Sequence, residues 1–324
     1  MTEKKILYLS KADVNAVGLN MAEVIELLET AFEEKGHGRV EMPPKPGIHP
    51  GGGDNFIHAM PAYIPALGSA GIKWVSGFPD NAKKGLPYIS GLLILNDPET
   101  GIPLAVMDCE WITGMRTAAA SAVSARRLAR PESSTLGVLG CGLQGFTNTE
   151  ALNVDFPIEE VFAYDLSKKS LAIYTEKVEK LGLKVTIVDT PEKAVKGCDL
   201  VVTAGPILKE PHKTIQASWL EKGAFASLVD FDSYWHPDAL KEFDKFCTDD
   251  HNQFDYYQSV GYFQDAPLRH ADLGELVAGQ KAGREAATER NAACNLGLAL
   301  DDMAVAPTLY KRAVEKGIGT WLPL

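Results

Sequence analysis

The chain has 324 residues, of which 45% are hydrophobic and 23% charged, a composition typical of a globular protein with a sizeable core. Acidic residues outnumber basic ones by 43 to 32, and this net charge of -11 disfavours nucleic acid and anionic membranes as partners. The five cysteines are far apart and form no CxxC pair, which argues against a disulfide framework or a structural zinc site.

The length favours two domains over one. The chain opens Met-Thr-Glu-Lys-Lys without an apolar signal-peptide core, and no apolar run reaches the roughly 18 residues that a membrane span requires. Since the dispersed cysteines also suit a reducing compartment, we predict a cytoplasmic protein without a membrane segment.

The first third of the chain has the pattern of an antiparallel α+β unit. An amphipathic helix is predicted over 20–35, with Asn20 as its N-cap. The Pro- and Gly-rich run 43–53 then predicts a loop without regular structure, which carries Lys45 and His49.

Short β-type runs follow. Strands are predicted over 56–64, 71–78, 92–96 and 104–107. The last two are joined by the turn sequence 97–101, which is typical of a connection between antiparallel strands. An Ala-rich run over 116–130 predicts a helix that ends at Pro131.

After Pro131, strands and helices alternate. The predicted strands are 135–139, 161–164, 185–188, 200–203 and 224–229, and the predicted helices are 148–154, 168–181 and 191–196. Near-continuous apolar strands in such an alternation predict a parallel sheet covered by helices on both faces. A last helix is predicted over 291–316, kinked or broken at Pro307.

A glycine-rich turn carries the strongest motif. Residues 140–145 read Gly-Cys-Gly-Leu-Gln-Gly between a predicted strand and a predicted helix, and Asp165 closes the next strand, which is the dinucleotide fingerprint. Gly140 permits the tight turn, Gly142 lets the pyrophosphate approach, and Gly145 allows close helix packing. Asp165 is expected to bind a ribose hydroxyl and to repel a 2′-phosphate, which favours NAD(H) over NADP(H).

Two aspartates follow the strand predicted over 224–229. Asp230 and Asp232 are two residues apart, so both carboxylates would face the same side of an extended segment. Because two close carboxylates cannot both ionise freely, one pKa is expected to be raised to a value suited to general acid–base chemistry.

The seven histidines show no metal-ligand spacing. The run Asp-Asp-His over 249–251 is expected to be a solvated loop, and no metal is predicted. The aromatic-rich segment 254–263 is expected to pack in the core or at a dimer contact rather than over a ligand.

Further motifs are spread over nearly the whole chain. They are Met60-Pro61, Gly71–Val75, Asn96-Asp97 with Thr100-Gly101 and Pro103, Arg116–Ala119, the glycine-rich turn with Gln144, Asp272–Leu276 and Gly317–Gly319. Together they resemble the ornithine cyclodeaminase and mu-crystallin family, which also includes archaeal-type alanine dehydrogenases and cyclic ketimine reductases.

The resemblance implies an α/β fold in which a Rossmann NAD-binding domain, 118–302, is inserted in an α+β substrate and dimerisation domain, 1–117 with 303–324. It also implies a homodimer. The motif and the resemblance together predict the residues that bind NAD(H): Gly140, Gly142, Leu143, Gln144, Gly145, Asp165 and Thr117.

The resemblance further implies that Arg116 and Lys73 bind the carboxylate of an amino acid, together with Lys45, where many members have Arg. This set is physically coherent, because an Arg offers a bidentate fork to a carboxylate and a Lys a point charge beside it. Lys73 is also expected to take part in catalysis.

The family's catalytic Asp matches Asp232, whereas Asp230 replaces a Gly and the following Pro-Gly-Lys is absent. His58 lies two residues before Met60-Pro61, where cyclodeaminases carry Glu, and this counts against ornithine. His58 and Asp230 are expected to contact the substrate.

The predicted function is NAD(H)-dependent oxidation of an L-amino acid at Cα, or the reverse reduction of an imine. One alternative is ornithine cyclodeaminase, which converts ornithine to proline and ammonia without net redox change. The other is a non-catalytic binding protein of the mu-crystallin type.

Overall fold

The computed structural model describes residues 4–324, which form two compact units. Unit 1 consists of the described residues up to Arg116 together with Leu298–Leu324, and unit 2 consists of Thr117–Gly297. Unit 1 is therefore assembled from two separate stretches of chain. Among the described residues, no helix has both the length and the apolar character needed to cross a membrane.

Unit 1 is built on a seven-stranded sheet in the order β15-β1-β6-β5-β4-β3-β2. Its strands are β1 (Lys5–Leu9), β2 (Gly47–Ile48), β3 (Phe56–Ile64), β4 (Ser69–Gly77), β5 (Ile89–Asn96), β6 (Pro103–Asp108) and β15 (Thr320–Pro323). The predicted antiparallel pairing of β3, β4, β5 and β6 is confirmed, and β1 pairs with β6 in parallel. The loop predicted over 43–53 differs in containing the two-residue strand β2, which pairs with β3.

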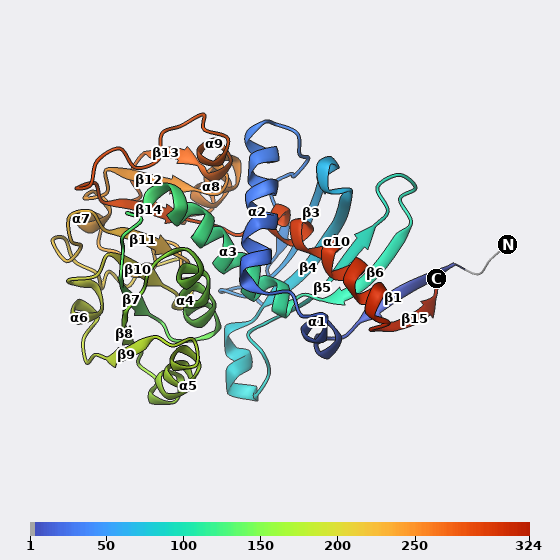
Figure 1. Cartoon of the computed structure of the whole chain (residues 1–324), viewed down its shortest axis with the longest axis horizontal. Helices are drawn as coiled ribbons and strands as arrows, with labels where there is room; N and C mark the ends of the chain where they lie inside the picture. The colour runs from blue at the N-terminus through green and yellow to red at the C-terminus, as the bar shows by residue number, and fades with distance from the viewer. Residues whose placement is uncertain (1–3) are drawn as a thin grey trace. The chain divides into compact units, whose positions relative to one another are not determined.

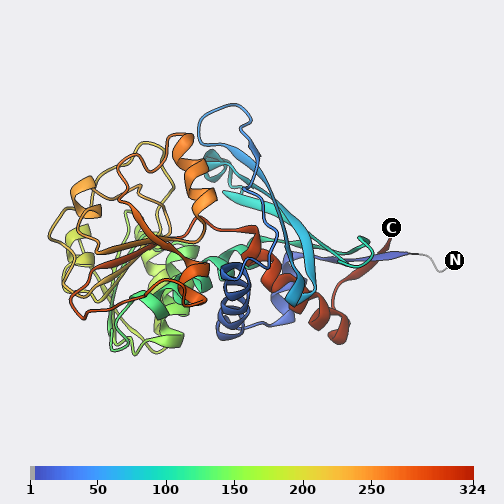
Figure 2. The same ribbon diagram turned by 90° about the horizontal axis from the view of Figure 1, so that it is seen from above.

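Helices α1 (Lys11–Val17) and α10 (Ala299–Lys316) pack against this sheet, and α2 (Met21–Gly36) packs on α10. The short 3-10 helices η1 (Pro65–Leu67) and η2 (Pro79–Lys84) lie in the connections from β3 to β4 and from β4 to β5. Helix α10 packs against strands β3 to β5 and against α2, as both views of the ribbon show (Figure 1, Figure 2). Side chains alternate along β4, so that Lys73 is buried whereas Trp74 is exposed.

The stretch predicted as one helix over 291–316 is two elements, and that prediction was wrong. It contains strand β14 (Asn291–Cys294), fully buried in unit 2, and then helix α10. Helix α10 continues through Pro307 rather than breaking there. Pro307 has no N–H to offer the Met303 carbonyl, and the hydroxyl of Ser69 donates to that carbonyl at 2.6 Å instead.

Unit 2 is an eight-stranded sheet in the order β13-β12-β14-β11-β10-β7-β8-β9, and its described strand pairs are parallel. Its strands are β7 (Thr135–Leu139), β8 (Glu160–Tyr164), β9 (Lys184–Ile187), β10 (Leu200–Thr203), β11 (Phe225–Leu228), β12 (Lys245–Thr248), β13 (Arg269–Asp272) and β14. Its helices are α4 (Leu143–Asp155), α5 (Lys168–Glu179), α6 (Pro191–Val195), α7 (Pro237–Leu240), α8 (His251–Ser259) and α9 (Leu273–Val277). The predicted α/β class with a Rossmann-type parallel sheet is confirmed.

Helix α3 (Glu110–Leu128) begins six positions before the predicted start at 116. The Asp108 carboxylate accepts the backbone N–H of Glu110 at 3.0 Å, which satisfies a free donor of the first turn. Arg116 therefore lies inside the helix rather than at its beginning.

Two further predictions concern α8 and its surroundings. The run 249–251 is not a solvated loop, because Asp249 is buried and accepts the N–H of Gly297 at 2.8 Å, while Asp250 caps α8. The aromatic segment 254–263 does pack in the core, where Phe254 and Phe263 stack with ring centroids 4.3 Å apart.

Candidate functional site

The glycine-rich turn joins β7 to α4 and has the geometry that a dinucleotide requires. Gly140 has φ +96°, and a Cβ there would lie 2.5 Å from the Ala204 carbonyl oxygen. A Cβ at Gly145 would lie 2.2 Å from the Gly140 carbonyl oxygen, so helix and strand pack too closely for any side chain. A Cβ at Gly142 would have open space around it. The residues present thus fit a bound pyrophosphate at the start of α4.

Asp165 follows β8 and lies beside this turn. Its carboxylate accepts the backbone N–H of Cys141 at 2.8 Å and that of Ser167 at 2.7 Å. These two bonds fix an acidic group next to the glycine-rich turn. Such a group suits a ribose with free hydroxyls and disfavours a 2′-phosphate.

The remaining residues predicted to bind the cofactor lie on helices α4 and α3. Leu143 and Gln144 open α4, and the Leu143 side chain is half exposed. Thr117 lies within α3 as the first residue of unit 2, and its carbonyl accepts the Ser121 hydroxyl at 3.3 Å.

Unit 1 contains a buried cluster of two cations and two carboxylates. Lys73 is fully buried, and its Nζ lies 2.7 Å from the Asp302 carboxylate. Arg116 Nη1 lies 3.3 Å from the Asp301 carboxylate, and its Nε lies 3.4 Å from that of Asp302. Burial, followed by the charge of Arg116, lowers the pKa of Lys73, and Asp302 opposes this shift.

Asp301 and Asp302 were not predicted as site residues. They belong to the first turn of α10, and both are fully buried. The available signal was a pair of adjacent acids within the apolar run Leu-Ala-Leu-Asp-Asp-Met-Ala-Val. A buried carboxylate requires a partner, so this pair alone indicated buried cations elsewhere in the chain.

His58 and Lys45 lie near this cluster. Burial, together with the charges of Lys45, His49 and Lys73, lowers the pKa of His58 to about 3. The imidazole stacks on Phe56 with centroids 4.4 Å apart, so it is a fixed neutral ring. The charges of Lys45 and Lys73 thus both act on the His58 ring within unit 1.

Asp230 is buried beyond the carboxyl end of β11. Its Oδ1 accepts the hydroxyl hydrogen of Thr203 at 2.6 Å, and its Oδ2 accepts the N–H of Gly205 at 2.8 Å. Burial raises its pKa to about 7. Both oxygens are therefore committed to holding the ends of β10 and β11 together.

Asp232 lies two residues further along the same loop and is buried as well. Among the described residues, none hydrogen-bonds its Oδ1. Burial raises the pKa of Asp232 to about 6, and the nearby Asp265 adds to the shift. A carboxyl group with a free oxygen and this pKa is equipped to exchange a proton near neutral pH.

The predicted geometry of these two aspartates was wrong in one respect. The segment is a turn rather than an extended strand, because Phe231 between them has φ +65°. Burial, and not mutual repulsion, is the main cause of both raised pKa values.

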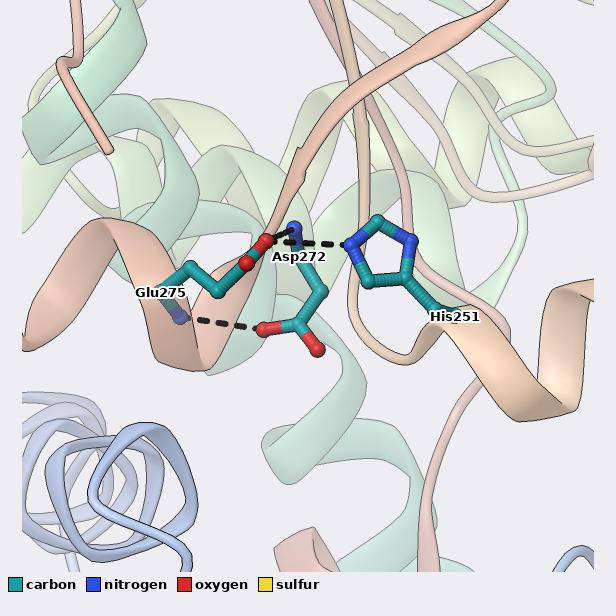
Figure 3. A group of neighbouring side chains, drawn as sticks. All are labelled: His251, Asp272 and Glu275. Atoms are coloured by element: carbon teal, nitrogen blue, oxygen red, sulfur yellow. Dashed lines mark hydrogen bonds and ion pairs between the residues drawn. The ribbon is translucent and has the colours of Figure 1, made fainter. Parts of the chain in front are cut away.

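Unit 2 contains a group of three neighbouring side chains that could bind a metal ion: His251, Asp272 and Glu275 (Figure 3). Asp272 and Glu275 form a capping box at the start of α9, in which each carboxylate accepts the other's backbone N–H. His251 Nε2 lies 3.0 Å from the Glu275 carboxylate. The Asp272–Leu276 motif thus begins a helix, and these contacts account for its two acids without a metal.

The chain matches the model of the ornithine cyclodeaminase/mu-crystallin family over residues 4–317. It is 35% identical to an alanine dehydrogenase of Archaeoglobus fulgidus, with 97% of each chain covered. An archaeal alanine dehydrogenase dimer with bound NAD has a TM-score of 0.88 and 34% identity, over 99% of this chain and 100% of that one. The Delta(1)-pyrroline-2-carboxylate reductase of Thermococcus litoralis, in complex with NADH and L-proline, has a TM-score of 0.87 and 32% identity, over 97% and 99% of the two chains.

Proposed function

Because the chain belongs to the ornithine cyclodeaminase/mu-crystallin family, we propose that it is an NAD(H)-dependent oxidoreductase acting at the Cα of an L-amino acid or on the corresponding imine. The observation that carries this proposal is Asp232, a buried carboxyl group whose Oδ1 accepts no hydrogen bond from any described residue. It follows a strand of the same parallel sheet whose β7 leads into the glycine-rich turn. Carboxyl ends of parallel strands meet at one edge of a sheet, where open α/β folds bind their ligands.

The two units have different roles in this proposal. Unit 1 holds the substrate carboxylate through Arg116 and Lys73, with Lys45 as a further cation, and unit 2 binds NAD(H). NAD⁺, when bound, supplies the acceptor for the hydride that leaves Cα. Fixing the carboxylate orients the Cα hydrogen toward the acceptor. This orientation lowers the activation barrier mainly through entropy.

Asp232 is the general acid–base group in this proposal. In the oxidative direction its carboxylate accepts a proton from the amino group or from the water that attacks the iminium carbon, and ammonia and a keto acid are released. In the reductive direction the protonated form donates. A pKa near 6 allows both states near neutral pH.

A dehydrogenase is favoured over ornithine cyclodeaminase by the environment of two residues. A second ammonium on the substrate requires a carboxylate, but His58 is neutral and Asp230 has both oxygens engaged by Thr203 and Gly205. We therefore expect net production of NADH from an amino acid, or net consumption with an imine.

In the decisive assay, the enzyme is incubated with ornithine and a catalytic amount of NAD⁺, and the proline formed is measured. A cyclodeaminase regenerates its NAD⁺ and would complete many turnovers per NAD⁺, which would overturn the proposed net redox reaction. A second assay follows NADH absorbance with a panel of amino acids, and with keto acids plus ammonia. No change with any of them would favour a non-catalytic binding protein.

We expect the protein to bind NADH more tightly than NADPH, and Asp165→Ser to narrow the difference because it removes the repulsion of a 2′-phosphate. Titration of cofactor fluorescence measures both affinities. Equal affinities in the parent protein would contradict this assignment. The substitution also removes the bonds to Cys141 and Ser167, so NADH binding is expected to weaken as NADPH binding improves.

The outer face of the unit 1 sheet supports a homodimer. Trp74 is 50% exposed and lies opposite Ala59 on one neighbouring strand and Leu92 on the other, and Leu92 is 45% exposed. Tyr8 and Tyr63 are further exposed aromatic residues of this sheet. A contiguous apolar face of this kind is typical of a subunit interface.

We expect Trp74→Glu to convert the dimer largely to monomer, because it places a charge in the proposed interface. Analytical ultracentrifugation measures the change. Leu268→Glu is the matched control, since Leu268 is an exposed leucine of unit 2 and its replacement should leave the dimer intact. A parent protein that sediments as a monomer would contradict the proposed interface.

A further inference from the structure

The aromatic residues of α8 and the turn after it take no direct part in the proposed chemistry, yet they surround the residue next to Asp232. That residue is Phe231, which is 3% exposed. Three rings lie around its ring at centroid distances of 4.9, 5.3 and 5.9 Å: Phe263, Tyr257 and Tyr262. Phe263 is in turn stacked on Phe254, so the cluster is anchored in the core of unit 2.

Two of these residues have a backbone conformation that bulky side chains avoid. Phe231 has φ +65° and Phe263 has φ +55°. Glycine would adopt either conformation at lower cost, and a phenylalanine holds it only where its surroundings enforce it. The buried ring at 231 therefore fixes the turn in a strained form instead of letting it relax.

Both strained residues act on Asp232. Phe231 precedes it in the chain, so its φ sets the direction in which the Asp232 side chain leaves the turn. The backbone N–H of Phe263 acts on the Asp232 carboxyl group and lowers its pKa, against the effect of burial. The carboxyl is thus held from two sides, while its Oδ1 is left without a hydrogen bond among the described residues.

We propose that Phe231 and Phe263 are positioning residues, which hold the Asp232 carboxyl group in a buried orientation in which no described residue hydrogen-bonds its Oδ1. This inference rests on the proposed acid–base role of Asp232. The aromatic segment 254–263 would then do more than fill the core, because core packing alone does not require the left-handed conformations of Phe231 and Phe263.

The test is Phe231→Gly, which permits the backbone conformation and removes the ring. We expect kcat to fall by about 10- to 100-fold through loss of alignment, with the KM of the amino acid within about threefold of the parent value. We also expect the acidic limb of the kcat/KM profile to move to lower pH. Burial is what raises the pKa of Asp232, and a loosened turn admits water.

The ionisable groups that act electrostatically on or with Asp232 are Asp265, Asp230 and Cys294, and this substitution leaves all three in place. Phe243→Ala is the matched control. Phe243 belongs to the same core and its ring lies 5.4 Å from that of Trp235, but it has no described ring contact with Phe231 or Phe263. It should lower the unfolding midpoint without moving the acidic limb.

Should Phe231→Gly fail to fold by circular dichroism, Tyr262→Leu replaces it, since Tyr262 is only partly buried and its loss should shift kcat and the limb in the same directions by less. A folded variant whose kcat and acidic limb match the parent would overturn the inference, as would an equal shift in Phe243→Ala. Asp232→Asn distinguishes a failure of the positioning role from a failure of the acid–base role. If that variant is inactive while Phe231→Gly is normal, only the positioning role fails, whereas an active Asp232→Asn removes the proposed acid–base group itself.

Discussion

Replacing Asp232 with asparagine should lower turnover of the amino acid by about 10²–10⁴-fold, because the amide keeps the shape of the side chain but cannot accept a proton. NADH affinity should stay near the parent value, since Asp232 and the glycine-rich turn follow different strands. Steady-state kinetics with a parallel NADH titration measure both quantities. In the parent enzyme, kcat/KM for oxidation should rise with pH through about 6, the pKa of Asp232, and this limb should be absent from the variant.

Asp230→Asn is the informative comparison. Asp230 is held by Thr203 and Gly205, so its replacement should cost about 1–3 kcal/mol of folding free energy through mispaired buried groups. Its effect on turnover should be much smaller than that of Asp232→Asn. The opposite ranking of the two turnover losses would show that Asp230 is the acid–base group.

The second large effect is expected on stability. Asp302→Asn leaves the fully buried Lys73 without its closest carboxylate, which should lower the free energy of unfolding by about 3–5 kcal/mol. Removing this carboxylate also lowers the pKa of Lys73 further, because Asp302 favours the charged form of Lys73. Urea denaturation followed by circular dichroism measures the loss.

The control for Asp302→Asn is Asp80→Asn. Asp80 pairs with Lys83 at 2.6 Å on the surface, where the two side chains are 73% and 79% exposed. Exposed pairs add little, so this variant should unfold at the parental urea concentration. Equal midpoints for the two variants would show that the buried cluster does not contribute to stability as proposed.

The sequence predicted the parallel unit well because each of its signals is local. Apolar runs such as 135–139 and 200–203 match β7 and β10 residue for residue, and Gly140 and Gly145 leave no room for a side chain, as the motif indicates. Helix ends were less accurate. Helix α4 begins at Leu143 rather than 148, since the motif that starts it contains none of the usual capping side chains.

What the sequence could not supply is pairing between distant residues. Lys73 and Asp302 are 229 residues apart in the chain, and neither position alone shows that the other neutralises it. The turn at Phe231 was likewise hidden, because no local pattern predicts a left-handed phenylalanine. Its conformation depends on the rings of Tyr257 and Phe263, which come later in the chain.

The split composition of unit 1 has a consequence for biosynthesis. Helix α10, which covers the sheet, and strand β15, which pairs with β1, both belong to Leu298–Leu324 and leave the ribosome only after the whole of unit 2. At a synthesis rate of about 5–20 residues per second, the synthesis of unit 2 takes roughly 10–40 s. During this time the sheet of unit 1 lacks α10 and β15. Throughout that interval Lys73 lacks its carboxylate and the apolar side of the sheet lacks its helix, so the nascent chain has its greatest need of a chaperone before α10 emerges.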